Sequence, residues 1–370
     1  MAAPWVILRR FLGVVPKQAE AENPAAISTA LRAPPRVTIL SVGPSARPEA
    51  TRPDKVPYLI AADPTGLLIC FTVGEAPSET VDLIVAREFL PPPGDPSRYP
   101  TTGSAEHIPR RPASMPATCN LRSVGLTPGL FAGDYVIAEL QVGMRRAKLL
   151  RFFSRERLWI ETDLPSPLSS MDREWAPSGV VAHEGRLWFL DLSWGLISCD
   201  PTTILPALRF HNLPPGRYIH EAKPFLHTIR CISVSNQMLR YVDIARDLDL
   251  DGRAAERKVV VWTGIPDPVS GDRDCSVRWL KTYEMSFKEI WNDPSYKDTQ
   301  LPKMIPEIVL VNPRSPNVVY FFLRRSLFGV DVPAHRVVGF VKDAHKLVAP
   351  RCRRCVLPWD LAPSIANGNI

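Results

Sequence analysis

Apolar residues along this chain fall in short runs that are bounded by turn residues, and residues 174–201 show the pattern most clearly. A β-branched run at 179–183 is followed by a Glu-Gly turn, then by a run of Leu, Trp and Phe at 186–192. A third run at 196–199 stops before an Asp-Pro pair. Because proline has no N–H for a strand ladder, the third strand ends there. The stretch therefore predicts three consecutive antiparallel strands, a β-meander.

The same pattern recurs on both sides of this stretch. The other expected strands lie at 36–42, 58–73 (a hairpin), 135–140, 148–153, 158–162, 207–211, 229–234, 238–244, 258–262, 277–285, 307–311, 318–323, 327–330 and 336–342. About fifteen short strands in successive meanders are typical of propellers and related multi-sheet folds. The sequence thus predicts an all-β fold that is β-propeller-like, with two packed β-sandwich domains as the alternative.

One short helix is expected near residues 287–293. Ser286 and Glu289 have the spacing of a capping box, and Pro294 bounds the helix at about two turns. Strands and helices do not alternate along the chain, so a doubly wound parallel sheet is excluded.

The expected organisation has three parts. Residues 1–35 predict an N-terminal strand and a mobile connector, 36–342 form the β-rich region, and 343–370 form a C-terminal tail. Within the β-rich region, 91–116 is rich in proline and poor in apolar residues, and it is expected to be a surface loop.

Composition supports a β-rich globular protein. The chain has 370 residues, of which 39 are prolines, and this proline content disfavours long helices. The formal net charge of +7 is modest for this length, and the basic residues occur in small separate groups. Because a nucleic-acid surface needs a continuous basic patch, nucleic-acid binding is not favoured.

Seven cysteines are an odd number and are spread along the whole chain, a pattern that favours a reducing compartment, cytoplasmic or nuclear. Residues 1–19 lack acidic side chains, as organellar transit peptides do, so organellar targeting is the alternative. The apolar run before Arg9 is too short for a secretory signal, and no segment is long enough to cross a bilayer. No membrane association is expected.

Two tryptophans in the central stretch are candidates for a ligand-stacking pair or a partner surface. Trp188 lies in the second strand of the meander, and Trp194 lies in the turn that follows it. With the period of two of a β-strand, Trp188 and Leu190 share one face, while Leu187 and Phe189 share the other. Because both faces are apolar, the alternative is that both indoles are part of the core.

Asp247, Asp249 and Asp251 are candidate metal ligands, because alternate carboxylates followed by a glycine can surround a hard cation. The twelfth position of an EF-hand loop would fall on Lys258, where a glutamate is needed. An acidic turn is the alternative.

Cys352 and Cys355 form a single CxxC motif, which fits a redox pair or half of a zinc site completed by His335 and His345. The histidine spacing matches no zinc finger, and the strand-to-helix context of a redox motif is missing. Two unpaired thiols are the alternative.

Motifs for catalysis and for cofactors are absent from the sequence. It contains no nucleophile elbow, no HExxH and no glycine-rich phosphate loop. His183 and Glu184 put a base beside a carboxylate, as do His220 and Glu221, but neighbours on a strand point to opposite faces. No catalytic residue and no cofactor are expected.

Several longer runs together resemble a known family. They read APSGVVAHEGRLWFLDLSWGLISCDP, YLIAADPTGLLICF, GDYVIAELQ, MSFKEIWNDPSYK, LPKMIPEIVLVNP and NVVYFFLRRSLFGVDV. From about residue 5 to residue 342 the chain resembles the plant family called domain of unknown function 1618 (DUF1618), which is abundant in grasses. The resemblance implies no known activity and carries over no catalytic residue.

The family is similar in character to the β-rich domains that accompany F-box segments, although this sequence has no leucine-rich helical segment of that kind at its start. Many strands and loops without a reaction motif predict a non-enzymatic protein-interaction module with an unknown protein partner. The alternative is an enzyme or small-ligand binder that uses a central pocket without a linear motif.

Overall fold

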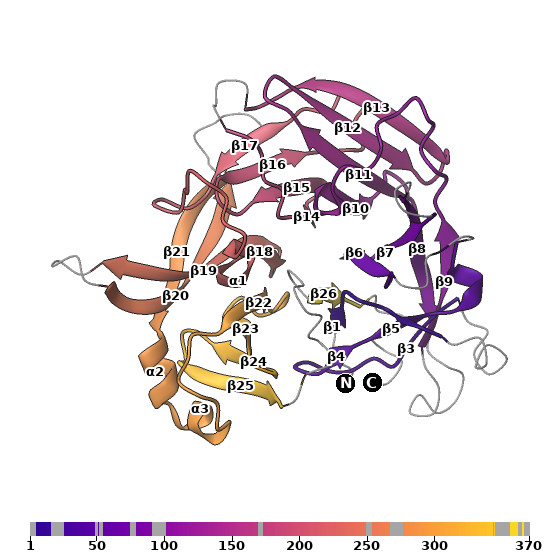
Figure 1. The fold of residues 1–370 in the computed structure, drawn as a ribbon. Coiled ribbons are helices and arrows are strands. Elements are labelled where there is room, and N and C mark those ends of the chain that lie inside the picture. Colours follow the sequence, from indigo (N-terminus) through magenta and orange to yellow (C-terminus); the bar gives the residue numbers. More distant parts are fainter. Residues whose placement is uncertain are drawn as a thin grey trace.

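The computed structural model describes residues 5–15, 26–48, 51, 55–74, 79–90, 101–168, 173–248, 254–266, 277–342, 344, 356–361 and 365. Strands make up most of this part of the chain, and the helices are few and short. The sheets are arranged around one axis as a β-propeller (Figure 1). The predicted all-β, propeller-like fold is confirmed.

Four blades are four-stranded antiparallel meanders whose strand order follows the sequence. Blade 2 contains β10 (Val124–Pro128), β11 (Tyr135–Val142), β12 (Arg146–Phe153) and β13 (Leu158–Pro165). Blade 3 contains β14 (Gly179–His183), β15 (Arg186–Asp191), β16 (Gly195–Cys199) and β17 (Arg209–Asn212). Blade 4 contains β18 (Arg230–Ser235), β19 (Met238–Leu248), β20 (Ala254–Pro266) and β21 (Val277–Ser286). Blade 5 contains β22 (Glu307–Val311), β23 (Val318–Leu323), β24 (Ser326–Asp331) and β25 (Arg336–Val341).

Blade 1 is a seven-stranded sheet, in which a four-stranded meander is extended at its outer edge. The meander contains β6 (Tyr58–Asp63), β7 (Gly66–Val73), β8 (Thr80–Leu90) and β9 (Thr101–His107). The outer strands are β3 (Ile27–Thr29), β5 (Leu40–Val42) and β2 (Gly13–Val14). Antiparallel pairing of β3 with β9 joins the two parts.

A three-stranded sheet, called the closing sheet here, joins the two ends of the chain (Figure 1). Its strand β26 (Val356–Asp360) pairs antiparallel with β1 (Trp5–Arg9), and β4 (Val37–Thr38) pairs parallel with β1 on the other side. Because strands from distant parts of the sequence share this sheet, pairing between them holds the ring together.

The innermost strands form a closed ring of contacts in the order β6, β10, β14, β18, β22, β26 and back to β6. Five meander blades and the closing sheet therefore surround one axis. The alternative of two packed β-sandwiches is wrong, because each sheet packs against two neighbours around the ring.

The core is divided among the six spaces between neighbouring sheets. Each space contains one cluster of buried apolar side chains. Four clusters lie between consecutive blades, one lies between blade 5 and the closing sheet, and one lies between the closing sheet and blade 1. In blade 3, Trp188 and Leu190 pack toward blade 4, while Leu187 and Phe189 pack toward blade 2. A blade is thus buried on both faces, as the two apolar faces of the central strand predict.

The helices lie outside the sheets. They are α1 (Leu226–Ile229), α2 (Phe287–Asn292), α3 (Pro294–Asp298) and the 3₁₀ turns η2 (Pro44–Ala46) and η3 (Leu121–Ser123). The predicted short helix is confirmed as α2, and its capping box is formed. The Ser286 hydroxyl accepts from the Lys288 N–H at 3.0 Å, and the Ser286 N–H donates to Glu289 Oε2 at 2.8 Å.

Three expected segments contain strands that the sequence pattern did not predict. The prediction of a loop over 91–116 is wrong at Thr101–His107, which form β9, whereas 91–100 lie outside the described residues. Ile27–Thr29 in the expected connector form β3, and Val356–Asp360 in the expected tail form β26. These short strands are stabilised by partners far away in sequence, so local alternation does not identify them.

Close packing between strands β16 and β17 leads to a prediction at Gly195. A Cβ added there would lie 2.5 Å from both the His211 carbonyl oxygen and a Phe210 ring carbon. We expect Gly195→Ala to lower the free energy of unfolding by about 1–3 kcal/mol, because a backbone oxygen cannot move away cheaply. Urea unfolding followed by tryptophan fluorescence measures the loss.

The matched control for that substitution is Gly185→Ala. Gly185 lies in open space with a φ of +71°, so alanine there meets only the strain of a left-handed backbone, about 1 kcal/mol. A Gly195→Ala protein that is no less stable than the Gly185→Ala protein would contradict the packing argument.

Candidate functional site

A cavity of about 380 Å³ lies on the propeller axis and is lined by inner strands from all six sheets. Its wall combines apolar side chains and backbone with a few charged groups. The charged and titratable groups near the carboxyl ends of the strands are Asp63, His183, Glu184 and Asp360. The centre of the ring is therefore hollow and open to a ligand of modest size.

The titratable groups at this end of the axial cavity each have a partner. Asp63 accepts hydrogen bonds from the N–H and the hydroxyl of Thr65 at 2.9 Å, and burial raises its pKa. Burial lowers the pKa of His183, although Glu184 Oε1 lies 3.8 Å from its Nε2. Among the described residues, no group of three or more His, Cys, Asp or Glu side chains could hold a metal ion.

A second cavity of about 250 Å³, called the mouth cavity here, lies at the opposite end of the axis, where the inner strands begin. It shares Arg10, Ile60, Gly179 and Val180 with the axial cavity, so the two spaces adjoin. Loops that precede β14 and β18 form much of its wall. The mouth cavity thus depends on how these loops are held.

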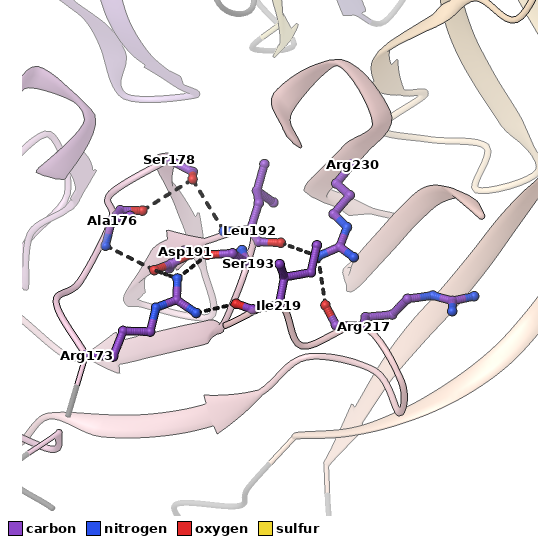
Figure 2. A network of polar contacts seen from close by, with 9 residues as sticks. All are labelled: Arg173, Ala176, Ser178, Asp191, Leu192, Ser193, Arg217, Ile219 and Arg230. Carbon is purple, nitrogen blue, oxygen red and sulfur yellow. Dashed lines mark hydrogen bonds and ion pairs between the residues drawn. The ribbon is translucent and has the colours of Figure 1, made fainter. Parts of the chain in front are cut away.

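Figure 2 shows the polar network that holds the loops of blade 3 beside the mouth cavity. Asp191, at the end of β15, accepts from the Ser193 N–H at 2.8 Å and also from the Ser193 hydroxyl. Its other carboxylate oxygen accepts from the Ala176 N–H at 3.0 Å and from Arg173 at 3.3 Å. Arg173 donates further to the Ser193 hydroxyl and to the Ile219 carbonyl. The Asp191 charge is thus neutralised inside the protein.

A buried arginine continues the network into blade 4 (Figure 2). Arg230, at the start of β18, donates from Nη1 to the carbonyls of Leu192 and Arg217, both at 2.7 Å. Arg217 in turn lies 2.7 Å from Asp243 on β19. These contacts fix the turn between β15 and β16 of blade 3 against blade 4. The wall of the mouth cavity beside this turn is therefore held in place.

The two candidate tryptophans lie in different parts of the core. Trp188 packs against His211 between blades 3 and 4, with the ring centroids 4.9 Å apart and the rings tilted by 42°. Trp194 packs between blades 2 and 3 against Trp175 and Phe210. Both are almost fully buried, and the structure does not bring them together as a stacking pair.

The other candidate residues lie mostly outside the described part of the chain. Asp247 belongs to strand β19, whereas Asp249 and Asp251 lie outside the described residues. Cys352 and Cys355 also lie outside the described residues. The metal and redox predictions for these five residues therefore stay predictions.

Sequence analysis missed the residues that build the mouth cavity. Arg10 and Asp191 line it, and Arg230 holds the loops beside it. These three residues are far apart in sequence and belong to no linear motif. Asp191 had one available signal, because it is a carboxylate in a strand that is otherwise apolar on both faces. Such a residue needs buried hydrogen-bond donors, and these commonly come from neighbouring loops.

A separate surface feature, called the apolar loop patch here, lies on two loops at the other end of the propeller. It consists of Leu130 and Phe131 in the β10–β11 loop and Ile204 and Leu205 in the β16–β17 loop, which are 74%, 59%, 92% and 87% exposed. The two loops meet at a hollow of about 50 Å³ lined by Leu130, Phe131 and Thr202. Four large apolar side chains on adjoining loops are unusual for a water-exposed surface.

The loop that carries Ile204 and Leu205 is firmly anchored. Buried Arg151 on β12 donates to the Pro201 carbonyl at 3.0 Å and to the Thr203 carbonyl at 2.6 Å. Asp200 accepts from the N–H and the hydroxyl of Thr202 at 2.8 and 2.7 Å. The loop is thus held in one conformation while its apolar side chains point into solvent.

Comparisons with known proteins give limited information on function. None of the curated proteins matches the chain. The crystal structure of the Mitotic Checkpoint Complex is similar with a TM-score of 0.34 and 9% identity, covering 80% of this chain and 73% of that chain. The α-L-arabinanase of Penicillium chrysogenum complexed with arabinobiose has a TM-score of 0.34 and 12% identity, covering 72% and 74%. The β-propeller domain of Cps50 (Swd1) from Myceliophteria thermophila has a TM-score of 0.35 and 9% identity, covering 85% and 100%.

Similarities at these TM-scores and identities carry no argument about activity. Within the described ranges, no helix has both the length and the apolar character needed to cross a membrane. The model of one family, described as a protein of unknown function (DUF1618), matches residues 188–320. This region contains most of blade 3, the whole of blade 4 and the first strands of blade 5. The match supports the predicted resemblance to the DUF1618 family over these residues.

Proposed function

We propose that this protein is a non-enzymatic protein-interaction module that binds a partner protein through the apolar loop patch. The observation that carries the proposal is the exposure of Ile204 and Leu205 on a loop whose backbone is fixed by Arg151. Burying two such side chains against a partner gains about 1.5–3 kcal/mol each. Because Ile204 and Leu205 are almost fully exposed in the unbound protein, they bury little apolar surface there.

The rigidity of the loop favours binding. A loop that is already fixed in one conformation loses little conformational freedom when a partner covers it, so more of the contact energy appears as affinity. Apolar anchors at the centre of a contact, surrounded by polar residues, are typical of binding hot spots. The apolar loop patch combines a fixed loop with exposed apolar side chains.

The chemistry of the patch indicates what the partner presents. Arg155 lies over the Phe131 ring, with its guanidinium carbon 4.2 Å from the ring centroid. Its side chain is about half exposed, and its contact with Asp134 at 3.9 Å is long. The expected partner surface therefore carries apolar side chains beside a carboxylate that pairs with Arg155.

The test compares the partners retained by three tagged proteins in plant tissue, the source that the family resemblance suggests. These are the wild type, the Ile204→Ser/Leu205→Ser variant, and a control Leu280→Ser/Met304→Ser variant that removes equally large exposed side chains elsewhere. A partner retained by the wild type and the control should be lost from the patch variant. With the purified partner, calorimetry should show affinity weakened on the order of tenfold or more.

Two outcomes would overturn the proposal. The first is a partner set that is the same for the patch variant and the wild type. The second is a homodimer of the purified chain, seen by light scattering, that the patch variant dissolves, because the patch would then be an oligomer contact. Arg155→Glu adds a separate check, since it should weaken the partner's binding as well.

A second candidate function is the binding of a small ligand at the propeller axis. The observation that favours it is the pair of adjoining cavities. The axial cavity, which His183 helps to line, is the central pocket that the sequence-based alternative required. This candidate is independent of the apolar loop patch, because the cavities and the patch lie on different surfaces.

The compartment is proposed from the thiols. Cys70, Cys119 and Cys199 are free cysteines. Burial also raises the pKa of Cys70 and Cys199 to about 12, so these two thiols are unreactive in the folded protein. Free thiols support a reducing compartment, the cytoplasm or the nucleus.

A further inference from the structure

The mouth cavity carries more positive than negative charge. Three cationic side chains, Arg10, Arg122 and Lys223, contribute to its lining, against the single carboxylate of Asp191. Four donors already occupy the Asp191 carboxylate, including the Arg173 guanidinium, so it does not offset the cations that face the cavity. Lys223 also contacts Glu221, at 3.1 Å, which lies outside the lining.

Arg10 is the charged residue among those that both cavities share, and backbone carbonyls hold its side chain in place. Its Nη1 donates to the carbonyls of Leu59 and Ile60, both at 2.9 Å, and its guanidinium lies 5.6 Å from the centre of the Tyr58 ring. No carboxylate pairs with Arg10 in the described part of the chain, and its buried Nε has no hydrogen-bond partner there. A fixed guanidinium with unused donors favours an anion.

Charge changes sign along the axis. Beyond Arg10, the axial cavity has an apolar middle, contributed by side chains such as Ile60, Leu126 and Val180. At its far end the lining carries Asp63, Glu184 and Asp360 but no Lys or Arg side chain that could pair with an anion. An anionic group is therefore favoured only at the mouth, while an apolar body fits the space beyond it.

We propose that the mouth cavity binds a small organic anion, with one carboxylate or phosphate group placed at Arg10 and an apolar body directed into the axial cavity. Ser178 also lines the mouth cavity, and because its hydroxyl contact with the Ala176 carbonyl is long, at 3.4 Å, this hydroxyl can turn to donate to such a group. The rigid network around Asp191 holds this wall in place without a ligand. The proposal rests on the second candidate function and not on the apolar loop patch.

The test measures binding of four probes to the full chain by calorimetry. The probes are phenyl phosphate, 3-phenylpropionate, inorganic phosphate and the neutral compound benzyl alcohol. We expect the better of the two aromatic anions to bind at least about tenfold more tightly than benzyl alcohol, because only the anions use the charged donors. Comparing the two aromatic anions distinguishes a carboxylate from a phosphate ligand, and tighter binding of inorganic phosphate would overturn the apolar part of the proposal.

Variants locate the binding at the mouth cavity. Arg10→Gln should weaken the better aromatic anion by about tenfold, because it removes the guanidinium. Since Arg10 also supports two carbonyls, the exposed pair Arg122→Gln/Lys223→Gln gives a second measurement that does not depend on folding. Arg145→Gln, an exposed arginine outside both cavities, is the matched control and should leave affinity unchanged.

Three results would overturn the proposal while leaving the partner-binding proposal intact. The first is equal affinity for the aromatic anions and benzyl alcohol, and the second is no binding of either anion. The third is anion affinity that is unchanged both in Arg10→Gln and in the Arg122→Gln/Lys223→Gln pair. Raising the salt concentration should weaken binding of the anions and not of benzyl alcohol, because salt screens the cationic mouth.

Discussion

Replacing Trp359 with alanine is expected to lower the free energy of unfolding by about 3–5 kcal/mol, the usual cost of deleting a large core aromatic side chain. Trp359 is the buried anchor of β26, with 3% of its surface exposed. Its ring packs edge-on against Phe89, with centroids 5.0 Å apart, and its Nε1 donates to the Asp63 carbonyl at 3.3 Å. The side chain thus joins the closing sheet to blade 1, and urea unfolding measures its contribution.

Trp359→Phe is the matched control for this prediction, because it keeps an aromatic ring in the same space and should retain most of the stability. Hydrogen exchange adds a local readout. In the alanine variant the amides of β1 should exchange faster than those of blade 3, since β1 depends on β26 for its antiparallel partner. A loss below about 1 kcal/mol, or β1 protection that does not change, would contradict the anchoring role of Trp359.

Arg230→Met is expected to lower the free energy of unfolding by about 2–4 kcal/mol, because two carbonyls lose their donor and each unsatisfied buried group costs about 1–3 kcal/mol. Arg230 is 7% exposed, and its Nη1 serves both Leu192 and Arg217. Methionine keeps much of the side-chain volume, so the loss reports the hydrogen bonds and the charge more than the packing. Chemical unfolding of the two proteins gives the difference.

Arg145→Met, at an exposed position of the β11–β12 turn, controls for the loss of one positive charge and should change stability by less than about 0.5 kcal/mol. If Arg230→Met were as stable as this control, the network between blades 3 and 4 would contribute little. Because the same network forms one wall of the mouth cavity, Arg230→Met should also weaken the anion probes.

The meander blades could be predicted from the sequence because each is built from neighbouring strands joined by short turns. Alternation within 186–192 even indicated that blade 3 is apolar on both faces, and the core clusters on its two sides bear this out. Alternation with a period of two is a local signal, so it can be recognised in the sequence without knowledge of the tertiary structure. The expected strands therefore cover blades 3, 4 and 5, three strands of blade 2 and the inner hairpin of blade 1, whereas β8 and β10 were missed.

The expected strands at the N-terminus and at 36–42 contain β1, β4 and β5, but β3 and β26 could not be predicted in the same way. These two strands have at most five residues each, and they pair with β9 and β1, which lie far away in sequence. Strands this short have no clear alternation, and their stability comes from tertiary packing instead of local preference.

The candidate site was still less accessible to sequence analysis. The mouth cavity depends on Arg10 meeting loops from blades 2, 3 and 4, and such a meeting exists only once the ring is closed. The tryptophans were noticed because of their size, yet size also favours burial, and Trp188 and Trp194 are core residues. A site made by convergence of loops leaves no spacing pattern in the chain.

The pairing of β1 with β26 has a consequence for synthesis on the ribosome. The first strand of the propeller emerges before all five blades, but its antiparallel partner is made only after them. Until then the nascent chain carries an unpaired strand edge and an open side of blade 1, while blades 2 to 5 can already form from local hairpins. Ring closure is thus the step with the longest loop to close, and it sets the period during which the chain needs protection from aggregation.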